Sequence, residues 1–220
     1  MKCAVITPVG PGHEYLSPDA LDSAQDAFTF NRGPFSELVI LKIDDTQGKM
    51  GRSAARNSGV ETAMKNNIDW VFFLDADDVM LPSAFADIDP YIRDFDAIFG
   101  QICCMGLHDE RFELRPGQML RISSIDDLLI QDPVMLLQIG HFVRTSVAHA
   151  NPFDVNLDTG EDFDYFLRVW SAYRCTKIGS PLFINRQGAH SIGPRSATGR
   201  GWLAAVRQIR NAYQNLRRGP

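Results

Sequence analysis

The stretch WVFFLDADDVMLP, residues 70–82, joins a continuous apolar run to three aspartates within four positions and then closes with proline. A short apolar run that ends in turn residues is typical of a strand buried on both faces. If the strand continues, Asp75 and Asp77 share one face, while Asp78 points away or enters the turn. Two like charges so close repel, and a hard divalent cation relieves that repulsion best. The alternative is a solvated turn before Pro82.

The residues before this stretch repeat the same kind of strand twice. CAVITPV at 3–9 and ELVILKIDD at 37–45 are short, apolar and rich in β-branched residues. Helical patterns follow each of them, over 17–30 and 53–67. Strand and helix in alternation predict a parallel sheet with crossover helices.

Polar side chains gather where these strands end. Thr7 lies at the end of the first strand, Asp44 and Asp45 end the second, and Asp75 and Asp77 end the third. In open α/β sheets, ligands bind outside the carboxyl ends of the strands. The sequence therefore predicts a ligand site at this edge.

Composition and charge exclude several classes of protein and of partner. The 220 residues carry a net charge of -5, with 45% hydrophobic and 22% charged residues, as in ordinary soluble domains. A pI near 5.5 argues against nucleic acid as a partner, because phosphate binding needs a clustered excess of Lys and Arg. The four cysteines show no CxxC spacing and are expected to be reduced. The N-terminal segment lacks a signal-peptide pattern, and the expected location is the cytoplasm.

The segment GRSAARNSGVETAMKNNIDWVFFLDADDVMLP, residues 51–82, resembles a stretch shared by family 2 glycosyltransferases. In that family a loop of the form G-x-S-x-ARN-x-G leads through a helix to a strand that ends in DxDD and then proline. A single DxD is a weak motif, but the ordered combination is fairly specific. The resemblance implies the GT-A fold, an α/β domain with a Rossmann-like mixed sheet flanked by helices.

A second landmark is NPFDVNLDTGEDFDYFLRVW, residues 151–170. It is similar to the later segment of the same family, in which a Glu-Asp pair precedes an amphipathic helix. The family's catalytic base is the aspartate of that pair, which falls on Asp162. An alternative for its neighbour is structural, because Asp158 and Glu161 have the spacing of a capping box. We expect Glu161 mainly to cap the helix and Asp162 to act in catalysis.

The resemblance covers roughly residues 3 to 190 and implies a nucleotide-sugar donor. Thr7 and one of Asp44 or Asp45 would contact the base and ribose. Arg52 or Arg56 would help to hold the nucleobase or diphosphate. For these arginines the alternative is a solvated position on the helix surface.

The resemblance also implies a divalent cation, Mn²⁺ or Mg²⁺. Asp75 would contact the ribose or a metal-bound water, and Asp77 would bind the metal itself. His190, in the polar loop NRQGAHSIGPRSATGR, would complete the metal shell. The alternative for a lone loop histidine is simple solvation.

The activity that follows is transfer of one sugar to an acceptor hydroxyl with inversion. A Gln-x-x-Arg-Trp motif and an apolar run of membrane-spanning length are both missing from the sequence, which argues against a processive polysaccharide synthase. The acceptor would be a glycan, a lipid-linked sugar or another hydroxyl. Two alternatives are a non-catalytic module that binds nucleotide sugars and a sugar nucleotidyltransferase.

Three parts of the chain are expected. Residues 1–100 would form the half that binds the nucleotide sugar, and residues 101–195 the acceptor and catalytic half of the same domain. Residues 196–220 form a basic amphipathic helix with an apolar stripe, which contains Trp202, Val206, Ile209, Tyr213 and Leu216. This helix would pack on the domain, join a second subunit in a homodimer, or rest on an anionic membrane as a peripheral contact.

Overall fold

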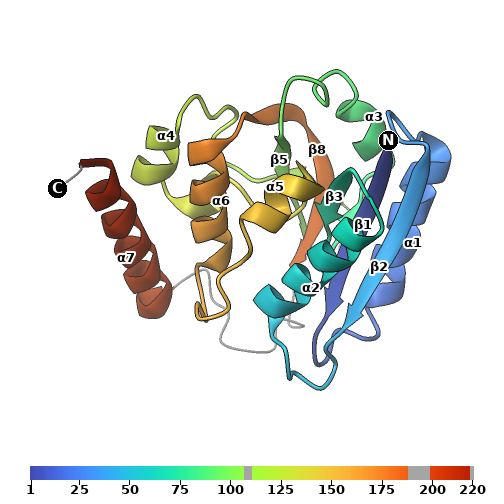
Figure 1. The fold of residues 1–220 in the computed structure, drawn as a ribbon, viewed down its shortest axis with the longest axis horizontal. Helices are drawn as coiled ribbons and strands as arrows, with labels where there is room; N and C mark the ends of the chain where they lie inside the picture. Colours follow the sequence, from blue (N-terminus) through green and yellow to red (C-terminus); the bar gives the residue numbers. More distant parts are fainter. Residues whose placement is uncertain (107–110, 188–198, 219–220) are drawn as a thin grey trace.

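The computed structural model describes residues 1–106, 111–187 and 199–218. One eight-stranded mixed sheet runs through the molecule, with its strands in the order β2-β1-β3-β7-β5-β8-β4 and β6 paired with β5. Figure 1 shows the sheet with helices packed on both sides. The mixed sheet flanked by helices confirms the predicted fold class.

The strands are β1 (Lys2–Val9), β2 (Glu37–Asp44), β3 (Trp70–Phe73), β4 (Val79–Met80), β5 (Ala97–Gly106), β6 (Glu113–Leu114), β7 (His141–Arg144) and β8 (Cys175–Gln187). β1 pairs in parallel with both β2 and β3, as the alternation in sequence predicts. β7 then lies antiparallel between β3 and β5. β8 is one long strand parallel to β5, with register shifts near Gln101.

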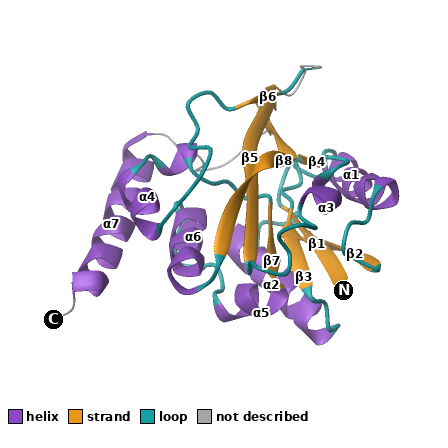
Figure 2. Cartoon of the chain, turned by 90° about the horizontal axis from the view of Figure 1, so that it is seen from above, coloured by secondary structure: helices purple, strands orange, loops and turns teal. Residues whose placement is uncertain are grey.

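The helices are α1 (Ser17–Phe30), α2 (Arg52–Lys65), α3 (Ala84–Asp87), α4 (Ile125–Ile130), α5 (Thr145–Ala150), α6 (Glu161–Ala172) and α7 (Gly199–Arg218), with a 3-10 turn at Pro133–Met135. α1 and α3 contribute to the apolar cluster on one face of the sheet. α2, α4, α5, α6 and α7 contribute to the cluster on the other face. Figure 2 shows this division from a second direction.

Strand periodicity explains why the sheet is buried on both faces. Along β1, Ala4 and Ile6 pack into one apolar cluster while Cys3 and Val5 pack into the other. Successive side chains of a strand point to opposite faces, so a strand covered on both sides must be apolar throughout. The continuous apolar runs recognised in the sequence follow directly from this requirement.

The C-terminal helix packs on the domain. Val206 and Ile209 of α7 are buried in the core, and Trp202 and Tyr213 are partly buried against it. The side chain of Leu216 lies outside the described residues. The apolar stripe predicted for this helix is therefore largely used within the chain. Among the helices of the described segments, none has both the length and the hydropathy that a bilayer crossing requires.

Candidate active site

The aspartates after β3 sit in a turn and not on an extended strand. β3 ends at Phe73, and the Asp78 backbone N–H donates to the carbonyl of Asp75 at 3.0 Å. The turn brings one oxygen from each of Asp75, Asp77 and Asp78 within 4.8 Å of the others. The strand therefore does not continue to Asp75 and Asp77, so the condition for their sharing one face is not met, and the three carboxylates cluster in the turn.

Asp78 is the member of this cluster that faces the protein interior. One of its oxygens accepts hydrogen bonds from the Asn185 side chain at 3.0 Å and from the backbone N–H of Arg186 at 3.1 Å. Burial, and then the charges of Asp77 and Asp75, raise the pKa of the Asp78 carboxyl well above its ordinary value. Asp78 therefore fixes the turn to β8, while Asp75 and Asp77 line the cavities described below.

Arg186 on β8 holds the same turn from its other side. Its Nε donates to the backbone carbonyl of Asp77 at 2.6 Å, and its Nη1 to the carboxylate of Asp19 at 2.8 Å. The side chain is buried, and it joins the first turn of α1 to the aspartate turn. The sequence analysis did not single out Arg186 or Asn185. Their polar positions within the strand-like run PLFINRQ were the available signal.

Arg56 on α2 is the centre of a buried ion cluster. Its guanidinium lies 2.7 Å from Asp75, 3.6 Å from Glu161 and 3.7 Å from Asp162, and the side chain is only 2% exposed. Burial alone would lower the pKa of Arg56, but the three carboxylates outweigh it and raise the pKa above its ordinary value. The alternative of a solvated arginine on the helix surface is thus wrong for Arg56.

Arg52 opens α2 and crosses to the start of α6. It donates to the carbonyl of Asp158 at 2.6 Å and to a carboxylate oxygen of Glu161 at 3.0 Å. Burial, followed by the charge of Asp162, raises the pKa of Glu161 to about 8. The N-cap of α6 is Gly160, in the left-handed conformation with φ of 81°. Glu161 is thus a buried partner of two arginines, and its expected role as a capping residue is corrected.

Asp162 is the second residue of α6, and its side chain is 38% exposed. Arg56 contacts it from the protein side, and the carboxylate reaches the lining of a cavity that Asp77 also lines. The two residues proposed for metal binding and proton abstraction therefore face one space.

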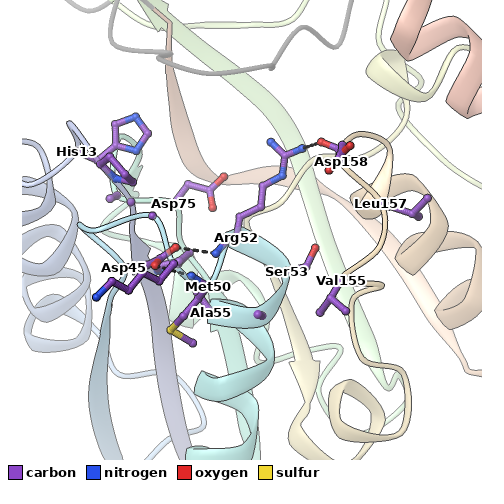
Figure 3. Close-up of a pocket in the computed structure, with 18 of the residues that line it drawn as sticks. His13, Asp45, Met50, Arg52, Ser53, Ala55, Asp75, Val155, Leu157 and Asp158 are labelled. Atoms are coloured by element: carbon purple, nitrogen blue, oxygen red, sulfur yellow. Dashed lines mark hydrogen bonds between the residues drawn. The ribbon is translucent and has the colours of Figure 1, made fainter.

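Two neighbouring cavities occupy this edge of the sheet. The first, of about 430 Å³, lies between the loop after β1, the start of α2 and the segment 155–158. The second, of about 380 Å³, lies between the start of α6, the end of β8 and α7. Arg52, Asp75 and Asp77 line both cavities. Figure 3 shows the first cavity, with Arg52 reaching across it to Asp158.

Asp45 shapes the first cavity. Its two carboxylate oxygens accept the backbone N–H groups of Met50 and Gly51, each at 2.8 Å. These bonds close the loop that leads into α2, and Gly48 and Gly51 take positive φ values of 65° and 77° within it. Of the two aspartates left open by the sequence, Asp45 is the one that lines the cavity.

Asp44 and Thr7 lie differently from Asp45. Asp44 is exposed and accepts the backbone N–H of Thr46 at 3.0 Å, and this bond lowers the pKa of Asp44. Thr7 is fully buried and lines neither cavity; Pro8 forms the wall beside it. Their contact with a donor stays a prediction.

Of the five histidines, His108 and His190 lie outside the described residues, and the other three lie in different surroundings. His190 lies outside the described residues, so its assignment as a metal ligand stays a prediction. His13, to which the sequence analysis gave no role, is buried and lines the first cavity (Figure 3). His141 is fully buried and stacks on Phe99, with ring centroids 4.4 Å apart, and His149 pairs with Glu61.

Comparison with solved structures identifies this architecture. The chain superimposes on Staphylococcus aureus TarS 1–349 in complex with UDP-GlcNAc at a TM-score of 0.64 and 16% identity, over 95% of this chain and 65% of that one. The UDP complex of the same protein gives a TM-score of 0.61 and 16% identity, over 95% and 64% of the two chains. The chain has the GT-A fold.

Two further comparisons found no match to this GT-A domain. No family model matches it, and no curated protein matches it. The longer TarS structure gives a TM-score of 0.64 at 16% identity over 95% of this chain. The GT-A domain spans only 39% of that longer chain, and less than two thirds of each TarS chain compared here.

Proposed function

We propose that this GT-A domain transfers a single sugar from a nucleoside diphosphate donor to an acceptor hydroxyl, with inversion and with the help of a divalent cation. The observation that carries the proposal is that Asp77, from the turn after β3, and Asp162, from the start of α6, line the same cavity. A cation ligand, Asp77, and a proton acceptor, Asp162, thus line one cavity.

The first cavity suits the donor nucleoside. Apolar side chains such as Pro11, Met50 and Leu157 offer surface to a base, and Asp45 lies among them. The cavity opens to the second one past Arg52, Asp75 and Asp77. Because TarS was solved with UDP-GlcNAc and with UDP, a uridine nucleotide is the first donor to test.

The aspartate turn has the chemistry of a site for Mg²⁺ or Mn²⁺. These cations take carboxylate oxygens and keep several waters or phosphate oxygens in their shell. Asp77, with Asp75, would hold the ion, and Asp78 would fix the turn through Asn185 and Arg186. When bound, the cation would offset the negative charge that builds on the departing diphosphate.

Asp162 would take the proton of the acceptor hydroxyl. A general base must lie within hydrogen-bond reach of that proton, and the exposed side of Asp162 meets the cavity. Arg56 would keep the carboxylate oriented through its contact at 3.7 Å. Attack from the face opposite the leaving group inverts the configuration of the sugar carbon.

Two variants test the proposal when combined with a panel of nucleotide sugars. Asp77→Ala should abolish Mn²⁺-dependent donor binding in calorimetry, because the principal cation ligand is lost. Asp162→Asn should keep donor affinity and lose turnover by at least a hundredfold, in line with the worth of general base catalysis. Asp26→Ala is the matched control, since Asp26 on α1 is exposed and lines neither cavity. Mn²⁺-dependent donor binding of wild-type affinity in Asp77→Ala, or full turnover in Asp162→Asn, would remove these assignments.

The same panel separates the two alternatives. A non-catalytic module would bind a nucleotide sugar without ever turning it over. A nucleotidyltransferase would release pyrophosphate from a nucleoside triphosphate and a sugar phosphate. Such an enzyme favours a loop with basic residues after its first strand, and the loop TPVGPGHEY, residues 7–15, has neither Lys nor Arg.

A further inference from the structure

The second cavity has an unusual lining for an acceptor site. The described residues around it are almost all polar, and they include three arginines, four acidic residues and three side-chain amides. Trp202 is the single aromatic side chain among the described residues of this lining. Gln138 and Gln187 are the two glutamines of this lining.

This lining disfavours two classes of acceptor. A lipid chain gains from apolar surface, yet no aliphatic side chain appears among the described lining residues. A polyanion gains from unpaired cations, but the three guanidiniums already pair with carboxylates. Acidic side chains also outnumber them around the cavity. A neutral, polar acceptor fits these charges best.

Trp202 stands close to the proposed base. It lies in the first turns of α7, which packs on the start of α6. A Cβ atom at Gly160 would lie 3.1 Å from Ile209, so the absent side chain lets α7 approach the start of α6 closely, and the Trp202 ring would lie 4.0 Å from the same atom. Trp202 is partly buried and lines the cavity.

We propose that the acceptor is a carbohydrate and that Trp202 provides the surface on which its ring stacks. A pyranose ring has an apolar face of C–H groups and a rim of hydroxyls. A planar indole matches the face. The amides of Gln138 and Gln187 can each donate to and accept from hydroxyls at the rim. The assignment rests on the proposed function, because it specifies the acceptor of that reaction.

Three small alcohols test the class of acceptor in the wild-type protein, with the donor selected by the nucleotide-sugar panel. Methyl glucopyranoside has both a ring face and hydroxyls, cyclohexylmethanol has the ring alone, and sorbitol has hydroxyls without a ring. The pyranoside should be used with a kcat/KM at least tenfold above that of the other two. Equal use of cyclohexylmethanol would overturn the assignment in favour of an apolar acceptor, and equal use of sorbitol would remove the role of the ring.

Variants at position 202 test whether the acceptor ring stacks on the indole of Trp202. Trp202→Leu keeps an apolar side chain but loses the planar face, so it should raise the KM for the pyranoside at least tenfold. Trp202→Phe keeps a planar ring, so its KM should return most of the way to the wild-type value. Donor affinity and slow donor hydrolysis by water should stay within twofold in both variants. Leu203→Ala is the control, because Leu203 is the neighbouring residue of α7 and is 59% exposed. The KM of Leu203→Ala for the pyranoside should equal that of the wild-type protein.

Failure of the acceptor assignment and failure of the proposed function would give different results. An unchanged acceptor KM in Trp202→Leu, or an equal loss of donor affinity, would overturn the acceptor assignment and leave the proposed function standing. If the wild-type protein neither binds nor hydrolyses any donor of the panel with Mn²⁺, the proposed function fails and the acceptor assignment with it.

Discussion

The side chain of Asn57 and the backbone of Phe153 form a reciprocal pair of hydrogen bonds. The Asn57 amide donates to the Phe153 carbonyl, and its oxygen accepts the Phe153 N–H, both at 2.9 Å. This pair joins α2, which carries Arg52 and Arg56, to the segment that leads into α6 and Asp162. The two sequence landmarks are thus held together by a side chain from the first of them.

Replacing Asn57 by alanine should therefore loosen both halves of the site. The change leaves the N–H and C=O of Phe153 without these partners, which is expected to cost about 2 kcal/mol in the free energy of unfolding. Urea unfolding at neutral pH measures this loss. Asn66→Ala is the control, because the exposed Asn66 amide donates to the nearby Thr62 carbonyl, four residues earlier in the chain. A loss no greater than in the control would show that the pair does not stabilise the domain.

Removing the charge of Arg56 should lower the free energy of unfolding by more than Asn57→Ala does. Arg56→Met leaves Asp75, Glu161 and Asp162 close together without their shared cation, and breaking a buried ion pair from one side costs about 3–5 kcal/mol. Thermal unfolding at neutral pH measures this loss. Arg174→Met, at an ion pair of 3.9 Å on the surface, should change stability by less than about 1 kcal/mol. Equal losses in the two variants would contradict a buried role for Arg56.

His141 should make the domain sensitive to mild acid. Neither buried ring nitrogen has a hydrogen-bond partner among the residues that the structure describes. Burial, followed by the charge of Arg56, lowers the pKa of His141 to about 3. The unfolded chain takes up this proton near pH 6.5 while the folded chain does not. Stability is therefore full above pH 6.5 and falls as the pH drops towards 3.

The expected loss from this one group is about 2 kcal/mol between pH 7 and pH 5. His141→Phe should remove that part of the pH dependence, since a phenyl ring takes no proton and can keep the stack on Phe99. Urea midpoints at pH 7, 6 and 5 give the comparison. His149→Gln serves as the control, because His149 is half exposed and pairs at the surface. An acid dependence that persists in His141→Phe would refute the assignment.

Gly59 should not tolerate a side chain. A Cβ atom there would overlap the Ile6 side chain, which is fully buried in β1. Gly59→Ala must therefore push α2 away from the sheet, at a cost of about 1–3 kcal/mol. Gly201→Ala is the matched control, because Gly201 lies on an exposed turn of α7 with no atom near the new methyl group. There alanine should stabilise the helix by up to about 1 kcal/mol, and differential scanning calorimetry measures both shifts.

The sequence by itself determined the central strands and the cluster of acids. Continuous apolar runs such as 3–9 and 70–74 are buried on both faces of the sheet. Their apolar composition therefore indicates that helices cover both faces. The position of Asp75, Asp77 and Asp78 at a strand end likewise required only the order of residues. These features are local, and local patterns can be read along the chain.

Only the tertiary structure decided which charges meet. Glu161 reads as a helix cap until the fold places two arginines from α2 beside it, 105 and 109 positions away in the chain. Arg186 gives no signal of its partners, because its contacts with Asp77 and Asp19 depend on how β8 packs beside the aspartate turn and α1. Burial and long-range pairing set the energies of such groups, and both arise only when distant segments come together.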